Sequence, residues 1–134
     1  MSTAANKAIV QGFLDDVFNR GNPARAVEQF ARASYVHYGP MVIGGKNAFI
    51  ECFERLARDY PGTRVEFRHV IAEGDFVVLH SRYQWSHEDG SEGIEIFRLD
   101  ACGNILEHWG VIERIPEPST DSNATPRAQR RALQ

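Results

Sequence analysis

Four strand-like runs separated by short turns are the feature that most limits what this chain can fold into. The runs are rich in Val, Ile and aromatic residues and cover residues 64–72, 76–85, 94–99 and 105–113. Parallel neighbours need a crossover of about a dozen residues or more, whereas antiparallel neighbours need only a turn. The second half of the chain therefore predicts an antiparallel meander.

The first half carries helical periodicity instead. Between residues 4 and 19 apolar residues recur at three- and four-residue steps, and Gly21 is placed to end this helix. Asn22 and Pro23 then offer an N-cap and a first helical residue for a short second helix. A third apolar stripe occupies residues 48–60. Helices followed by a meander predict an α+β fold and not a parallel α/β sheet.

Length and composition indicate one globular domain. The 134 residues suffice for a single core, and 43% hydrophobic with 25% charged residues is ordinary globular usage. We expect the domain to cover residues 1–116, and the polar, proline-punctuated residues 117–134 to form a flexible tail. The net charge of -3 gives no reason to expect a nucleic acid or an anionic membrane as partner.

The cysteines and the N-terminus predict a cytoplasmic protein without a structural metal. Cys52 and Cys102 are far apart and lack the spacing that arranges four ligands around zinc, so we expect reduced thiols. The first residues lack a secretory signal pattern, and no apolar run approaches the roughly 20 residues that span a bilayer.

Histidines and carboxylates on strands are the residues that could carry chemistry. The sequence has no glycine-rich phosphate loop, no nucleophile elbow and no His-Glu-x-x-His helix. In a pocket, burial and neighbouring charge can bring the pKa of a His or carboxylate to a value suited to proton transfer. The expected chemistry is acid–base work on a small molecule, with no cofactor and no metal.

The alternation of side chains along a strand bears on which face of the sheet each candidate occupies. His80 shares a face with Arg82, while the opposite face of the same run carries Val77 and Leu79 and is the more apolar, so parity puts His80 on the outer side. Parity does not decide the last run, and His108 is equally suited to a structural or a ligand-contacting role.

Two further candidates have open alternatives. Glu95 shares its face with apolar neighbours, so its carboxylate either pairs with Arg98 or Arg82 or lies at a polar spot in a cavity. His37 and Tyr38 are adjacent in a short extended segment, so only one of them can face inward.

Several segments together resemble the SnoaL-like branch of the NTF2-like superfamily. The resemblance extends from about Ala8 to Pro116 and rests on six segments, residues 35–40, 45–50, 70–75, 78–81, 95–98 and 105–109. It implies a cone of three N-terminal helices packed on a strongly curved antiparallel sheet, with an internal, mostly apolar pocket and a homodimer formed through the outer face of the sheet.

The resemblance also implies a site. It supports His80, His108 and Glu95 as catalytic residues, to which we add Tyr38 as a hydrogen-bond donor to an enolate oxygen. The ligand-contacting residues that we expect are His37, Trp109, Gly110, Arg82 and Phe53. Two positions depart from the family pattern: Tyr38-Gly39 replaces a His-Asn pair, and Gly110 replaces an aspartate that resembles the general base of SnoaL-type cyclases.

Two functions follow from the resemblance. One is cofactor-independent removal of a proton next to a carbonyl group, as in aldol, cyclase or isomerase reactions. The alternative is a non-catalytic dimer that binds a small hydrophobic ligand in a degenerate active site, which the glycine at position 110 favours. A purely structural dimer would have a small or filled cavity.

Overall fold

The structure is a computed structural model that describes residues 2–39, 41–86 and 90–115. The tail expected at residues 117–134 lies outside the described residues. No helix in the described ranges has both the length and the apolarity needed to cross a membrane.

Three helices form where the periodicity predicts them. Helix α1 (Thr3–Leu14) runs directly into a π-helical turn, η1 (Asp15–Asn19), and is followed by α2 (Pro23–Phe30) and α3 (Lys46–Asp59). The side chains of Ser2 and Asn22 cap the first turns of α1 and α2 by accepting backbone N–H groups. Gly21 has φ +64°, a left-handed conformation that glycine adopts without strain, and it ends the first helical segment.

Six strands make one sheet in the order β2-β1-β6-β5-β4-β3. The strands are β1 (Ala31–Tyr38), β2 (Ile43–Gly44), β3 (Arg64–Glu73), β4 (Phe76–Gln84), β5 (Ser91–Leu99) and β6 (Ile105–Arg114). The last four form the predicted antiparallel meander. The first strand differs from the prediction, because β1 pairs with β6 in parallel.

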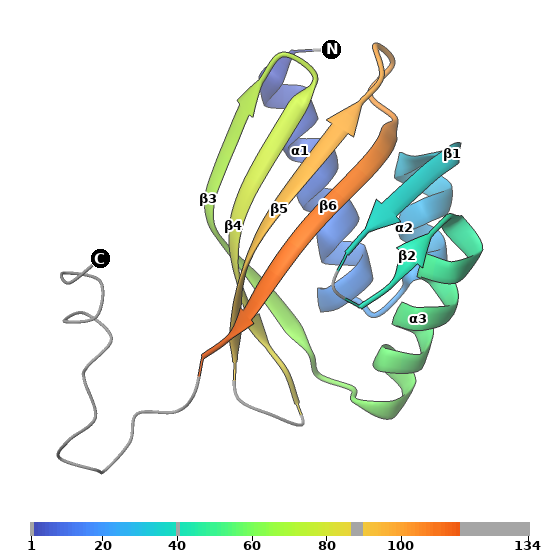
Figure 1. Cartoon of the computed structure of the whole chain (residues 1–134), viewed down its shortest axis with the longest axis vertical. Helices are drawn as coiled ribbons and strands as arrows, with labels where there is room; N and C mark the ends of the chain where they lie inside the picture. Colours follow the sequence, from blue (N-terminus) through green and yellow to red (C-terminus); the bar gives the residue numbers. More distant parts are fainter. Residues whose placement is uncertain (1, 40, 87–89, 116–134) are drawn as a thin grey trace, which may run out of the picture.

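The helices cover one face of the curved sheet (Figure 1), where α1 lies behind the meander and α2 and α3 lie beside β1 and β2. Aromatic rings fill the space between the layers, with Phe13 of α1 centred 5.6 Å from Phe49 and 5.9 Å from Phe97. Burying each such side chain contributes about 1.5–3 kcal/mol. The predicted α+β fold is confirmed.

The opposite face of the sheet is apolar and open. It carries partly exposed hydrophobic side chains from four strands: Ile71, Phe76, Ile94, Ile96 and Val111. Along β4 the residues from Val77 to Tyr83 alternate between the core and this outer face, and His80 and Arg82 face outward. Hydrophobic parity therefore assigned the two faces of β4 correctly.

Candidate functional site

Two histidines meet on the inner face of the sheet. His37 of β1 and His108 of β6 are direct neighbours in the parallel register. Both are almost fully buried, with 4% and 3% of their surface exposed. Their Nδ1 atoms lie 2.9 Å apart, and their rings are nearly perpendicular, at 85°. This distance is that of a hydrogen bond, so one ring donates to the other.

Glu95 holds the far side of His108. One carboxylate oxygen, Oε2, contacts Nε2 of His108, and the other, Oε1, accepts a hydrogen bond from the Tyr83 hydroxyl. The Phe97 ring stacks on the His108 ring at 4.0 Å. Glu95 therefore pairs with a histidine and a tyrosine inside the fold. The expected pairing with an arginine is not found, and Arg98 instead bonds to Glu107.

Two tyrosine hydroxyls complete this group, one beside the two histidines and one beside Glu95. The Tyr35 hydroxyl lies 3.3 Å from Nδ1 of His37 and 3.2 Å from Nδ1 of His108. Burial, with a smaller effect of the Glu95 charge, raises the pKa of Tyr35 and of Tyr83 well above the ordinary value. Both tyrosines are therefore neutral hydrogen-bond donors at neutral pH.

We assign the protons so that both ring nitrogens of His108 are hydrogen-bonded. With Glu95 ionised, His108 donates Nε2–H to the carboxylate, and its Nδ1 accepts from Nδ1–H of His37 and from the Tyr35 hydroxyl. Nε2 of His37 then carries a lone pair and has no hydrogen-bond partner among the described residues. Burial, with a smaller effect of His108, lowers the pKa of His37 to about 3, so the ring is neutral at pH 7.

Two glycines make room for this group. A Cβ atom at Gly39 would lie 1.9 Å from Nε2 of His37, so a side chain there would displace the ring. A Cβ atom at Gly110 would lie 3.2 Å from Oε2 of Glu95, its neighbour across the strands. The glycine in place of the family's aspartate thus leaves space for the Glu95 carboxylate.

The group borders a small apolar cavity. Its lining comes from helices, strands and the loop after β1 and consists of Leu14, Phe18, His37, Met41, Phe49, Phe53, Glu95, His108 and Ile112. The volume is about 10 Å³, room for about one water molecule. Met41, at 42%, is the most exposed of the lining residues.

The structure brings together part of the set predicted from sequence. His37, Glu95, His108 and Phe53 all line the cavity, and Gly110 lies against the Glu95 carboxylate. The segment containing His37 and Tyr38 was expected to turn only one of them inward, and this residue is His37.

The other predicted residues lie outside this inner group. His80 and Arg82 point outward because they alternate with the buried residues of β4. Tyr38 and Trp109 are neighbours in the parallel register and stack on each other at 5.5 Å, and Tyr38 is 41% exposed. Their positions alternate with those of His37 and His108, so both rings belong to the outer face.

His80 belongs to a different histidine pair. Its Nδ1 lies 3.0 Å from Nδ1 of His69 on the neighbouring strand, and the rings of half-buried His80 and exposed His69 stack with an interplanar angle of 10°. Its Nε2 lies 3.8 Å from a carboxylate oxygen of Glu92.

Sequence reasoning did not single out Tyr35 and Tyr83. Tyr35 precedes His37 by two residues and so shares its face, and Tyr83 belongs to the apolar face of β4. Parity could therefore have placed both hydroxyls beside the cavity.

Within the described ranges, no group of three or more His, Cys, Asp or Glu residues is arranged to hold a metal ion. The donors present, two imidazoles and one carboxylate hydrogen-bonded to one another, suit proton transfer.

Known structures share this fold. TsrD from Streptomyces laurentii is 20% identical, with a TM-score of 0.71 over 84% of this chain and 91% of that one. A candidate SnoaL-like polyketide cyclase from Jannaschia is 15% identical, with a TM-score of 0.71 over 83% and 87%. A candidate SnoaL-like isomerase from Agrobacterium tumefaciens is 18% identical, with a TM-score of 0.68 over 82% and 98%.

Sequence comparison gives the family directly. Comparison with curated protein sequences gives no significant match. The SnoaL-like domain profile matches residues 10–108, a range that contains His37, Glu95 and His108. The chain therefore belongs to the SnoaL-like family of the NTF2-like superfamily.

Proposed function

We propose that this protein binds a small carbonyl compound in the interior cavity and removes a proton from the carbon next to the carbonyl group, without a cofactor. The observation that carries the proposal is the free Nε2 of His37, at the end of a buried chain of hydrogen bonds that leads through His108 to Glu95. This nitrogen has no hydrogen-bond partner among the described residues, and it faces the space that a side chain at position 39 would fill.

The reaction step follows from this arrangement. Nε2 of His37 takes the proton as the carbon–hydrogen bond breaks, and the electron pair of that bond moves onto the carbonyl oxygen, giving an enolate. His37 becomes an imidazolium that still donates Nδ1–H to His108. The enolate then attacks a second carbonyl carbon, whose oxygen becomes an alkoxide and takes the proton from the imidazolium, or the enolate is protonated at another carbon by the same imidazolium. Either route restores neutral His37.

Glu95 stabilises the charge that this step creates. Its carboxylate is 4% exposed and lies one imidazole away from His37, so water screens the interaction only weakly. His108 transmits the effect because its Nδ1 accepts from His37 while its Nε2 donates to Glu95. Glu95 and His108 act as positioning residues behind the base, while Tyr35 and Tyr83 hold them in place.

The low pKa of His37 narrows the substrate class. A base with a pKa of about 3 is weak, and proton removal is efficient only when the acid strength of the substrate is matched to the base. A C–H group between two carbonyl groups is far more acidic than one beside a single ketone. We therefore favour a 1,3-dicarbonyl compound, a group that also occurs in polyketide chains.

The alternative is binding without turnover. The cavity of about 10 Å³ holds no substrate unless it widens, and Met41 is the exposed lining residue whose displacement would open it. Gly110 stands where the resemblance implies a catalytic aspartate. A ligand-binding homodimer without catalysis would keep the same pocket residues.

In either case we propose a cytoplasmic homodimer. The outer face carries exposed Ile71, Phe76 and Val111, and a second copy would remove this apolar surface from water. Light scattering during size-exclusion chromatography measures the mass. A mass near 15.1 kDa at micromolar concentration would exclude the dimer.

Hydrogen–deuterium exchange of ethyl acetoacetate in D₂O tests the catalytic proposal. We expect the protein to accelerate exchange of the protons between the carbonyl groups, and His37→Gln to reduce that acceleration by about 100-fold or more. His69→Gln, on the outer face, is the matched control and should retain the full rate.

Each other outcome has a defined meaning. An unchanged rate in His37→Gln would exclude His37 as the base. Ligand binding that depends on His37, without any exchange above buffer, would favour the non-catalytic alternative.

A further inference from the structure

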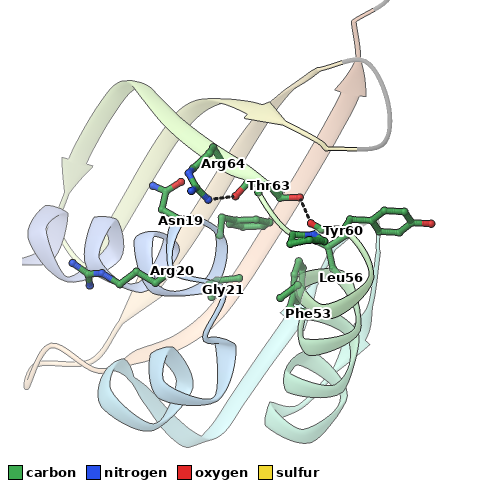
Figure 2. A pocket seen from close by; sticks show the side chains of 13 residues that line it. Asn19, Arg20, Gly21, Phe53, Leu56, Tyr60, Thr63 and Arg64 are labelled. Carbon is green, nitrogen blue, oxygen red and sulfur yellow. Dashed lines mark hydrogen bonds between the residues drawn. The ribbon is translucent and has the colours of Figure 1, made fainter.

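A second pocket lies at the end of the helical layer, outside the site described above. It measures about 300 Å³, at the lower end of the range for small-molecule sites. Figure 2 shows that its labelled residues come from three places: Asn19 and Arg20 at the end of η1, Phe53 and Leu56 on α3, and Arg64 at the start of β3.

The pocket borders the interior cavity. Phe18 and Phe53 line both spaces, and their rings meet edge to face with centroids 5.4 Å apart. A molecule held in the pocket therefore lies on the opposite side of this ring pair from His37. Leu56 and Ala57 extend the apolar wall along α3.

The charged side chains in the pocket lining are positive. Its lining includes two arginines and no acidic residue in the described part of the chain. Arg20 is paired with the buried carboxylate of Asp16 at 2.6 Å. Arg64 has no carboxylate partner among the described residues, and its guanidinium donates only to the Thr63 carbonyl, at 3.1 Å. Arg64 is thus the cation that remains available to a ligand.

Backbone donors add to this charge. The N–H groups of Gly21 and Gly62, both in the pocket lining, have no acceptor among the described residues. The ends of η1 and α3 oppose an anion, because helix C-termini carry partial negative charge. That effect is smaller than a direct hydrogen bond between a guanidinium and a carboxylate.

We propose that this pocket binds a small organic carboxylate, with the anionic group on Arg64 and the apolar skeleton against Phe18 and Phe53. A carboxylate is chosen because the planar guanidinium binds it through two parallel hydrogen bonds. Binding of a carboxylate in this pocket does not depend on the proposed catalysis at His37. The binding itself is measurable without turnover.

An NMR titration of the ¹⁵N-labelled full chain tests it, with 2-naphthoate as probe and 2-naphthamide as its uncharged analogue. The backbone amides of Gly21 and Gly62 report on the pocket. We expect naphthoate to shift both signals and to bind about fivefold more tightly than naphthamide, as a partly exposed charge contact would give.

Three variants separate charge from shape. Arg64→Gln should remove the preference for naphthoate, whereas Arg68→Gln, the same change on the same strand outside the pocket, should keep it. Ala57→Leu should weaken both probes, because it fills the pocket. Equal binding of the two probes, equal effects of the two arginine variants, or no shift of either glycine signal at millimolar probe would overturn the proposal.

The same titration on His37→Gln separates this proposal from the catalytic one. Retained naphthoate binding together with lost deuterium exchange supports both proposals. If deuterium exchange depends on His37 but naphthoate does not shift the Gly21 and Gly62 signals, the carboxylate pocket is overturned and the catalytic proposal stands.

Discussion

Among the described residues, two pairs of histidines meet across neighbouring strands, one on each face of the sheet. His37 and His108 face the helices, and His69 and His80 face outward. The Nδ1 atoms are 2.9 Å apart in the inner pair and 3.0 Å apart in the outer pair. The direct contact is nearly the same, so any difference in chemistry must come from what surrounds each pair.

The surroundings differ in burial and in charge. The inner pair is almost fully buried, and its carboxylate partner, Glu95, is buried with it. The outer pair is partly exposed, and Glu92 lies 3.8 Å from His80, where water and salt screen the interaction. The comparison teaches that a histidine pair becomes a candidate catalytic group through desolvation and a shared buried charge, not through residue type.

The largest expected effect at neutral pH is on the free energy of unfolding. His108→Ala leaves the buried Glu95 carboxylate without its histidine partner and should cost about 3–5 kcal/mol. His80→Ala removes a partly exposed ring that leaves no buried charge behind, so it should cost far less, about 1 kcal/mol or below. Urea denaturation measures both. Equal losses in the two variants would mean that the two faces do not differ as described.

The second effect is on acid stability. His37 has a pKa of about 3 when folded and an ordinary, higher pKa when unfolded, so between these values the unfolded chain binds the additional proton. Its contribution is complete above about pH 6.5 and is lost as pH falls toward 3, roughly 4–5 kcal/mol in all.

Denaturation curves at a series of pH values can isolate this contribution. Subtracting the His37→Gln profile from that of the unsubstituted protein removes the effect of the other titrating groups. The difference should grow with pH between 3 and 6.5, and the same subtraction with His69→Gln should be nearly flat. A flat His37 difference would show that His37 is not desolvated.

The third and smallest effect concerns position 110. Gly110→Asp would bring a second carboxylate beside Glu95, and we expect a loss of about 2 kcal/mol that shrinks at lower pH as one carboxylate is protonated. Val111→Asp on the outer face is the control and should change the stability of the chain little. Faster deuterium exchange in Gly110→Asp would instead show that the aspartate is the missing base.

Much of the fold could be predicted from local patterns. The first helical segment stops before Gly21, and α2 begins after its N-cap, Asn22. These boundaries and the turns of the meander depend on residues that are close together in the sequence. The parallel pairing of β1 with β6 could not be predicted this way, because it joins segments about 70 residues apart and leaves no local signature.

Only part of the candidate site could be predicted, because its contacts also join segments that are far apart in the sequence. The alternation along β4 predicted that His80 lies on the outer side, whereas the family resemblance predicted that it lines the pocket. In the structure His80 faces outward. The neighbours of Glu95 depend on the register of three strands, so its contacts with His108 and Tyr83 could not be derived from its own strand.

The most direct test of the central claim is an NMR measurement of the histidine ring nitrogens. A long-range ¹H–¹⁵N spectrum at pH 7 distinguishes a protonated nitrogen, a nitrogen with a lone pair and a charged ring. The account predicts that His37 is neutral, with its proton on Nδ1 toward His108 and a lone pair on Nε2. A charged His37, or a neutral ring with its proton on Nε2, would contradict it.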